Sequence, residues 1–246
     1  MPLQGNPLCN GDLLAVLHRA SHDELKEIVE ALHRSLDVRI KDNPHYIAAK
    51  RDLTRVPDVI ADYLLRAGGH SLVNAWRGSG PPYPKVLRDV CQVMKVSVSD
   101  GLGVVETEAL LLREVTERVW AKMSPEQRRA TLEKVGGELG AAAQEVARQN
   151  GGIGAVPLGV LVTLAGGQLL RMLLPELAVA VAGAAGAAGV LGGVAGVLAG
   201  PLGWAAGAVW VAAEVAGPSY RGLAPAVFQV AALRQGFLWQ DEEKAA

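Results

Sequence analysis

The chain has 246 residues, a formal net charge of −1 and a sequence pI near 6.5. This balance supplies no global positive field that could collect nucleic acid phosphates, so nucleic acid is not an expected partner. Half of the residues are hydrophobic, yet aromatic residues make up only 4% of the chain and glycine accounts for 29 residues. Small side chains therefore supply much of the apolar surface, which favours close contact between helix backbones.

The two cysteines and the first ten residues bear on disulfide formation, metal binding and cellular location. Cys9 and Cys91 lie far apart and form no C-x-x-C pattern, so neither a disulfide framework nor a zinc site is expected. Residues 1–10 lack a basic stretch followed by an apolar core, so we expect no signal peptide. A cytoplasmic location is the resulting prediction.

The first third of the chain predicts short helices. Apolar residues recur at helical spacing from Asp12, and Ser21 followed by Glu24 forms a capping box that opens a second helix. We therefore expect a helical hairpin over residues 12–37. The expected core face of its second helix comprises Leu25, Ile28, Val29, Leu32 and Leu36.

Proline and glycine punctuate the next stretch. The Asn43-Pro44 step interrupts the helical pattern, and Pro57 suits the first turn of a helix that ends at Gly68-Gly69. Further helices are predicted over residues 83–96 and 106–123. Their expected buried residues are Val86, Leu87, Val90, Val93 and Met94 in the first and Leu110, Leu111, Val115, Val119 and Trp120 in the second. Glu106 and Glu108 are interpreted as surface charges.

Residues Ser124-Pro125-Glu126-Gln127 are a clear helix start, with a cap, a first-turn proline and a Gln three residues after the cap. No credible strand pattern occurs, so the predicted fold class is all-α, a multi-helix bundle. We divide it into a soluble helical domain (1–150), an Ala/Gly-rich apolar segment (151–217) and a C-terminal part (218–246). The last part is predicted to hold an amphipathic helix over about 224–238 and a charged tail.

The apolar segment is nearly free of charge. Its charged residues are Arg171, Glu176 and Glu214, and none lies between the two glutamates. Because roughly 20 helical residues cross a bilayer core, this stretch could form one span or a hairpin of two shorter helices turned near Pro201. Arg171 requires a partner in apolar surroundings, and Glu176 is the nearest candidate in sequence. The other interpretation is that Arg171 reaches a polar boundary.

Glycines in this segment repeat at a spacing of four residues, just over one helical turn. Such a spacing forms flat stripes on which another helix can approach closely. The residues concerned are Gly189, Gly192, Gly193, Gly196, Gly200, Gly203 and Gly207. We therefore predict helix packing, in or against a membrane, in this region.

Signatures of catalysis and cofactor binding are missing from the sequence. It contains neither a phosphate-binding loop G-x-x-x-x-G-K-[ST] nor a nucleophile elbow G-x-S-x-G. His18 and His22 lie four apart and could share a metal, but without a third ligand pattern they are interpreted as solvated residues of one helix. Cys91 is interpreted as a core residue. We expect no enzyme activity, no metal and no cofactor.

Four segments carry a resemblance to a known family. Residues 70–80 (HSLVNAWRGSG), 83–90, 120–123 and 219–234 resemble the YaaW family of uncharacterised bacterial proteins, which is distantly similar to ubiquinol-cytochrome c chaperones. The Ala/Gly-rich region is longer and more apolar here than in the family pattern. The family-like positions are interpreted as packing and capping residues: Trp76, Arg77, Gly78, Tyr83, Trp120, Tyr220, Arg221 and Pro225.

Three functional hypotheses follow. In the first, the protein conditionally inserts its Ala/Gly-rich hairpin into the inner membrane, as a peripheral anchor or as a component of a self-assembling pore. It can also be an assembly factor or interaction protein that holds an apolar helix of a partner or of a second copy. In the third hypothesis the hairpin is buried at the centre of a soluble bundle, because a helix that is apolar all round must be buried in something.

Overall fold

The computed structural model describes residues 6–33, 40–68, 80–126, 128–129, 148–149, 152 and 218–245. No strand occurs in these ranges, and the all-α class is confirmed. The chain forms two compact units. Unit 1 combines Met1–Leu112 with Ala212–Ala246, and unit 2 is Arg113–Val211, so unit 2 is an insertion within the sequence of unit 1.

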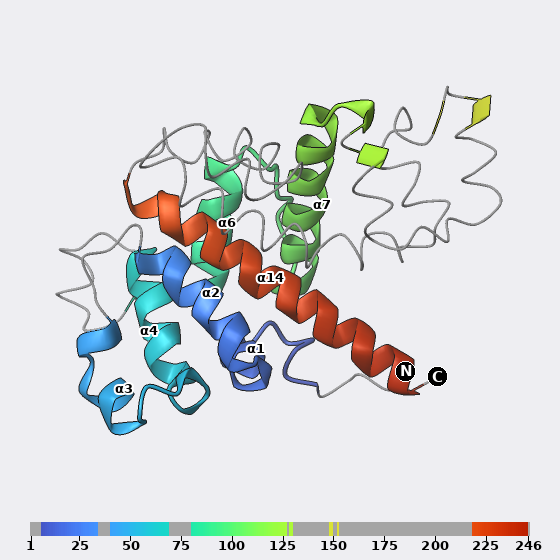
Figure 1. Ribbon diagram of the computed structural model, residues 1–246. Coiled ribbons are helices and arrows are strands. Elements are labelled where there is room, and N and C mark those ends of the chain that lie inside the picture. Colours follow the sequence, from blue (N-terminus) through green and yellow to red (C-terminus); the bar gives the residue numbers. More distant parts are fainter. Residues whose placement is uncertain are drawn as a thin grey trace. The chain divides into compact units, whose positions relative to one another are not determined.

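Two helices, α1 (Leu13–Arg19) and α2 (His22–His33), lie within the stretch predicted as an N-terminal hairpin and are shown in blue in Figure 1. The capping box is confirmed, because the Ser21 N–H donates to Glu24 Oε2 over 2.7 Å and the Glu24 N–H donates to Ser21 Oγ over 3.4 Å. Four of the five expected core residues of α2 are buried, and Leu36 lies outside the described residues. His18 and His22 are exposed but belong to different helices, so their placement on one helix was wrong: Ala20 has an extended backbone that ends α1.

Short helices follow α2. They are η1 (Ile40–Asp42), α3 (Pro44–Ala48) and η2 (Leu53–Arg55), and α4 (Pro57–Ala67) comes next with its predicted first-turn proline. The Asn43-Pro44 step starts α3, since Asn43 Oδ1 accepts from the His45 N–H over 2.9 Å. An Asn cap followed by proline at the first position is a favourable helix start.

Helices α6 (Tyr83–Val93) and α7 (Val104–Lys122) match the two helices predicted in the middle of the chain, with different ends. The first stops three residues early, because Lys95 adopts a φ of 55° and the Val96 N–H bonds back to the Cys91 carbonyl over 2.8 Å. The predicted buried residues of α6 are buried except Val93, which is half-buried. In α7, Leu110 is half-buried and Leu112 is buried instead.

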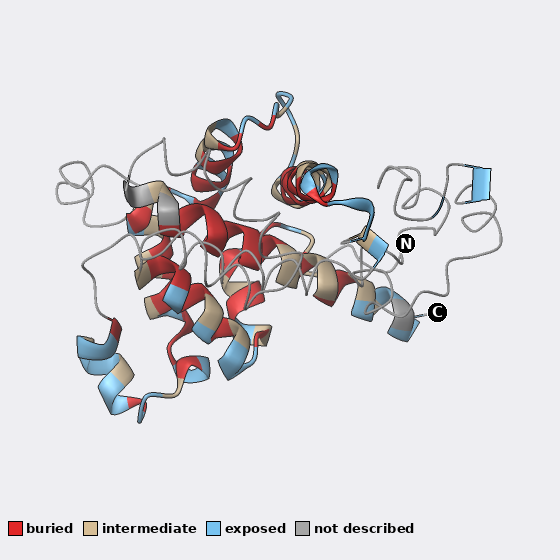
Figure 2. Cartoon of the chain, turned by 45° about the horizontal axis from the view of Figure 1, so that its top comes forward, coloured by how far each residue is buried: buried red, intermediate tan, exposed pale blue. Residues whose placement is uncertain are grey.

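Helix α14 (Pro218–Ala245) is the long red helix of Figure 1, and it packs on α1, α2, α4 and α6 of unit 1. Residues 222–231 are buried without interruption, as the red stretch of the same helix in Figure 2 shows. The prediction of an amphipathic helix over about 224–238 was therefore wrong in its bounds and in its first half. Several helices cover this half of α14, so it has no solvent face there.

Some expectations concern residues outside the described part of the chain. They include the glycine stripes, the turn near Pro201, the Arg171–Glu176 pair and most of the helix predicted after Ser124. Within the described residues, no helix is both long enough and apolar enough to cross a membrane. The three-segment division of the chain stays a prediction.

Candidate functional site

A buried ion pair lies at the centre of unit 1. Arg234 of α14 donates from Nε to Oε2 of Glu108 on α7 over 2.6 Å, and both side chains are 0% exposed. Each residue sits on an apolar helix face. Glu108 shares its face with Leu111, Leu112 and Val115, and Arg234 shares its face with Val230, Ala231 and Phe237. Burial of these two faces therefore carries both charges into the core, where each requires a partner.

Tyr83, the first residue of α6, provides a second hydrogen bond to the Glu108 carboxylate. Its hydroxyl donates to Glu108 Oε1 over 2.7 Å, so each carboxylate oxygen accepts one hydrogen bond. Burial raises the pKa of Glu108, and the Arg234 charge and the Tyr83 hydroxyl act against that rise. Burial, together with the nearby carboxylate, also raises the pKa of Tyr83 well above its usual value. The phenol therefore remains a protonated donor.

The guanidinium of Arg234 also holds the N-terminal turn. Its Nη1 donates to the backbone carbonyls of Leu8 and Asp12, each over 3.0 Å. Gly11 lies inside this turn with a φ of 75°, and a Cβ there would collide with Val104 at the start of α7. The Nη2 atom of Arg234 has no hydrogen-bond partner among the described residues.

A second, more exposed contact joins α1 to the end of α14. Arg19 Nη1 lies 2.7 Å from Asp241 Oδ2, and the Arg19 guanidinium carbon lies 4.7 Å from the centroid of the Phe237 ring. Asn6 Nδ2 donates to the same Asp241 oxygen over 3.2 Å. The hydrogen bond from Arg19 lowers the pKa of Asp241. This contact holds α14 about two turns beyond Arg234.

Cys91 lies on the buried face of α6 and is 0% exposed, as predicted for a core residue. Burial raises the pKa of its thiol to about 12, and the Glu108 charge acts in the same direction. Cys9 is half-exposed, and both cysteines are free. Because the thiolate is the reactive species, Cys91 is unreactive in the folded protein and can report on opening of unit 1.

The arrangement connects helices, and its three side chains are buried. Tyr83, Glu108 and Arg234 are exposed by 4% or less. Their hydrogen bonds join four parts of the chain: the N-terminal turn, α6, α7 and α14. No group of three or more His, Cys, Asp and Glu residues within the described ranges could hold a metal ion. The cluster therefore acts on the fold of unit 1 by fixing where α7 and α14 lie.

The structure describes part of the predicted residue set. Tyr83 is buried and bonded to Glu108, and Pro225 lies inside α14 and is buried. Tyr220 is half-buried on the first turn of α14. Trp120 is buried in unit 2, where its carbonyl accepts from Arg128 Nε over 2.9 Å and its ring lies 5.7 Å from that guanidinium. The side chain of Arg221 and all of Trp76, Arg77 and Gly78 lie outside the description.

Two central residues were missed from the sequence. Glu108 was interpreted as a surface charge, which is wrong because its side chain is fully buried, whereas the neighbouring Glu106 is exposed. Arg234 was placed only at the end of a family-like segment. A signal existed in both cases, since each charge interrupts an apolar stripe with a three- or four-residue period and the two charges have opposite signs.

The fold and the cluster define an all-helical protein whose discontinuous unit is closed by a buried ion pair. The chain belongs to the YaaW family, UPF0174. It is 32% identical over 186 residues to the UPF0174 protein YaaW of Escherichia coli O157:H7, which covers 72% of this chain and 70% of the relative. The YaaW protein of Escherichia coli K12 shows the same identity and coverage. A UPF0174 protein of Helicobacter pylori J99 is 27% identical over 78% of this chain and 76% of its own length. No family model and no solved structure matches the chain.

Proposed function

We propose that this YaaW family member is a non-enzymatic helical protein that conditionally inserts its Ala/Gly-rich segment into a membrane as a hairpin. The observation that carries the proposal is the position of unit 2 in the sequence of unit 1. Residues 113–211 follow a part of α7 and precede α14, and both of these belong to unit 1. The apolar segment 151–217 lies largely within this insertion, and a chain that leaves one compact unit and returns to it crosses a bilayer an even number of times or not at all.

The buried cluster strengthens this argument. Glu108 lies four residues before the end of the unit 1 part of α7, and Arg234 lies on the helix that follows the insertion. Their ion pair therefore ties the helix that leads into unit 2 to the helix that leads out of it. A hairpin needs such a base, because its two ends must stay together whether the segment is inserted or not.

The composition of the segment favours its burial in an apolar environment. No ionised side chain occurs between Glu176 and Glu214, and the glycine spacing suits close packing of two short helices against each other. Few basic residues flank the stretch, so the charge asymmetry that orients permanent spans is weak. Conditional association fits this balance better than permanent residence.

A second candidate function is that of an assembly factor or interaction protein. The stripe of small residues from Gly189 to Gly207 would provide a cradle for an apolar helix of another protein or of a second copy. The same stripe would allow the hairpin to be buried within its own chain. These readings share the helical hairpin and differ in what covers it.

Fractionation of cells with a carbonate wash tests the membrane proposal. A carbonate-resistant membrane fraction is expected, and it should be lost when Val190→Asp and Val197→Asp place two charges in the segment, because each charge at a bilayer centre costs about 3 kcal/mol. The matched control adds the same charges at the exposed positions Gln92→Asp and Ser99→Asp. Recovery of the unmodified protein wholly as a soluble monomer would refute both membrane insertion and self-association.

The packing argument has its own test. Leucine at Gly193, Gly196 and Gly200 should disrupt the helix packing of the segment and weaken its association with a partner helix, because its side chain keeps neighbouring backbones apart. Labelling of Cys91 in the same variant shows whether unit 1 remains closed. If association survives the three substitutions unchanged, the spacing carries no packing information. Dye release from liposomes separates insertion from the chaperone-like function.

A further inference from the structure

The segment from η1 through η2, residues 40–55, has an unusual surface, and we refer to it as the α3 lobe. Ile47 on α3 is 55% exposed and is the one large hydrophobic side chain of the described residues that is exposed. An isolated exposed aliphatic residue is common on soluble proteins and proves nothing alone. The charged residues of the same lobe make this exposed side chain informative.

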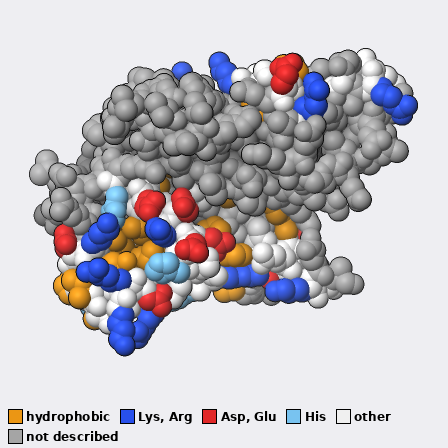
Figure 3. Space-filling model, viewed as in Figure 1, with side chains coloured by type: hydrophobic (Ala, Val, Ile, Leu, Met, Phe, Trp, Pro, Cys, Tyr) orange, Lys and Arg blue, Asp and Glu red, His pale blue; other side chains and the backbone are white. Residues whose placement is uncertain are grey.

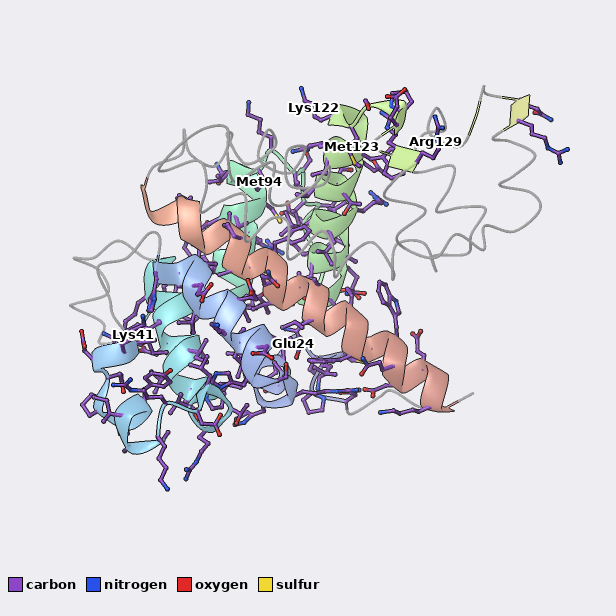
Figure 4. The ribbon with its side chains drawn as sticks, viewed as in Figure 1. Glu24, Lys41, Met94, Lys122, Met123 and Arg129 are labelled. Carbon is purple, nitrogen blue, oxygen red and sulfur yellow. The ribbon has the colours of Figure 1, made fainter. Side chains whose placement is uncertain are left out.

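Four cationic residues of the α3 lobe are exposed and form no ion pair with a described acid: Lys41, Lys50, Arg51 and Arg55. Elsewhere on unit 1, the cations Lys26, Arg66 and Lys85 each lie 4.0 Å or less from a carboxylate one helical turn away. Figure 3 shows Lys and Arg side chains beside hydrophobic ones at the lower left, where Figure 1 places α3. Figure 4 labels Lys41, which lies near the start of this lobe.

Two acidic residues also belong to the lobe. Asp52 is engaged locally, because its carboxylate accepts from the Thr54 N–H over 3.0 Å and from the Thr54 hydroxyl over 2.8 Å, and it lies 3.6 Å from His22 Nδ1. Asp42 is exposed. The cations therefore outnumber the acids two to one, in a chain whose overall formal charge is −1.

The backbone of the lobe is strained where two of the cations lie. Lys50 and Arg51 have φ values of 56° and 62°, although residues with a side chain rarely adopt this region. The Arg51 N–H closes the end of α3 by bonding to the Tyr46 carbonyl over 3.0 Å, a position where Gly or Asn is the usual neighbour. Strained non-glycine residues cluster where the side chains have a function. Here both strained residues are cationic and exposed.

We propose that the α3 lobe docks on an anionic bilayer surface. Ile47 enters the headgroup region, and Lys41, Lys50, Arg51 and Arg55 lie against the lipid phosphates. Charge complementarity selects this partner, because four exposed cations and one exposed aliphatic side chain on the same lobe match a diffuse negative surface. The inference shares its partner with the proposed function but rests on residues of unit 1 alone, so either can fail without the other.

Binding of the full chain to vesicles tests the proposal. Sedimentation with phosphatidylglycerol vesicles is expected to exceed sedimentation with phosphatidylcholine vesicles and to fall as salt rises. Lys50→Gln with Arg51→Gln should weaken binding on the order of 25-fold, about fivefold for each charge. Ile47→Ser should weaken it without changing its dependence on salt. Equal binding to both vesicle types would overturn the proposal.

A matched control removes the same charge elsewhere. Lys26→Gln with Arg66→Gln lies on α2 and α4, and it should leave binding within about twofold of the unmodified chain; an equal loss would show that only net charge matters. Lys50→Gly with Arg51→Gly relieves the backbone and should still weaken binding, which separates the charges from folding. Full competition by a single-stranded oligonucleotide would refute the lipid assignment. Salt-dependent binding that persists in the Val190→Asp, Val197→Asp variant separates the lobe from the hairpin.

Discussion

Replacement of Arg234 by methionine tests the role of the buried cluster directly. The substitution keeps an unbranched side chain in the core of α14 but leaves the Glu108 carboxylate with the Tyr83 hydroxyl as its remaining donor. The carbonyls of Leu8 and Asp12 lose their donor as well. Removal of one partner from a buried ion pair typically costs about 3–5 kcal/mol, and we expect a loss of that size in the free energy of opening unit 1.

The assay uses Cys91 as its probe. In a Cys9→Ser background, the rate at which a thiol reagent modifies Cys91 reports the free energy of opening, because the reagent reaches this 0% exposed thiol only in the open state. A loss of about 4 kcal/mol corresponds to roughly a 900-fold faster modification under these conditions. Circular dichroism at 222 nm during urea unfolding provides an independent value.

Two control variants test whether the loss comes from an unpaired buried charge. Arg66→Met breaks an exposed pair with Asp62 and should cost about 1 kcal/mol or less. The double variant Glu108→Leu, Arg234→Met leaves no unpaired charge and should recover part of the loss, while the Tyr83 hydroxyl and the carbonyls of Leu8 and Asp12 still lose their partners. A cost below about 1 kcal/mol for Arg234→Met, or a double variant as unstable as the single one, would refute the reasoning.

Three further predictions concern local features of unit 1. Ser21→Ala removes the capping box of α2 and should lower the free energy of unfolding by about 1 kcal/mol, measured in urea, and no change would mean that the box is not stabilising. Lys50→Gly relieves a φ of 56° and should raise the melting temperature, whereas a fall would contradict the strain argument. Burial raises the folded pKa of Cys91 from 9.0 to about 12, so its contribution to stability is present below pH 9 and is lost as the pH rises toward 12. The difference in unfolding free energy between the unmodified protein and Cys91→Ala should therefore shrink from pH 8 to pH 10.5.

Local signals in the sequence predicted the short helices well. Ser21 with Glu24 marked the start of α2, and Pro57 marked the start of α4, because caps and first-turn prolines act within one turn of the backbone. The apolar stripes of α2 and α6 predicted their buried faces for the same reason. In these elements, periodicity and packing agree.

The buried cluster could not be assembled from local signals. Glu106 and Glu108 are two residues apart in α7, yet one is exposed and the other fully buried, and only the stripe continuing to Val115 distinguishes them. The pairing of Glu108 with Arg234 joins residues 126 positions apart. The buried first half of α14 likewise depends on several helices that cover it from different sides. Such information belongs to the tertiary arrangement.

Because unit 1 is discontinuous in sequence, its two parts are synthesised at different times. Helix α14 supplies Arg234, and it leaves the ribosome only after the whole of residues 113–211. At roughly 5–20 residues per second, that insertion takes several seconds to emerge. During this interval Glu108 lacks its ion-pair partner Arg234, although the uncharged stretch between Glu176 and Glu214 has already been translated. The nascent chain thus passes through a stage in which its most apolar part has been made and the ion pair of unit 1 has not.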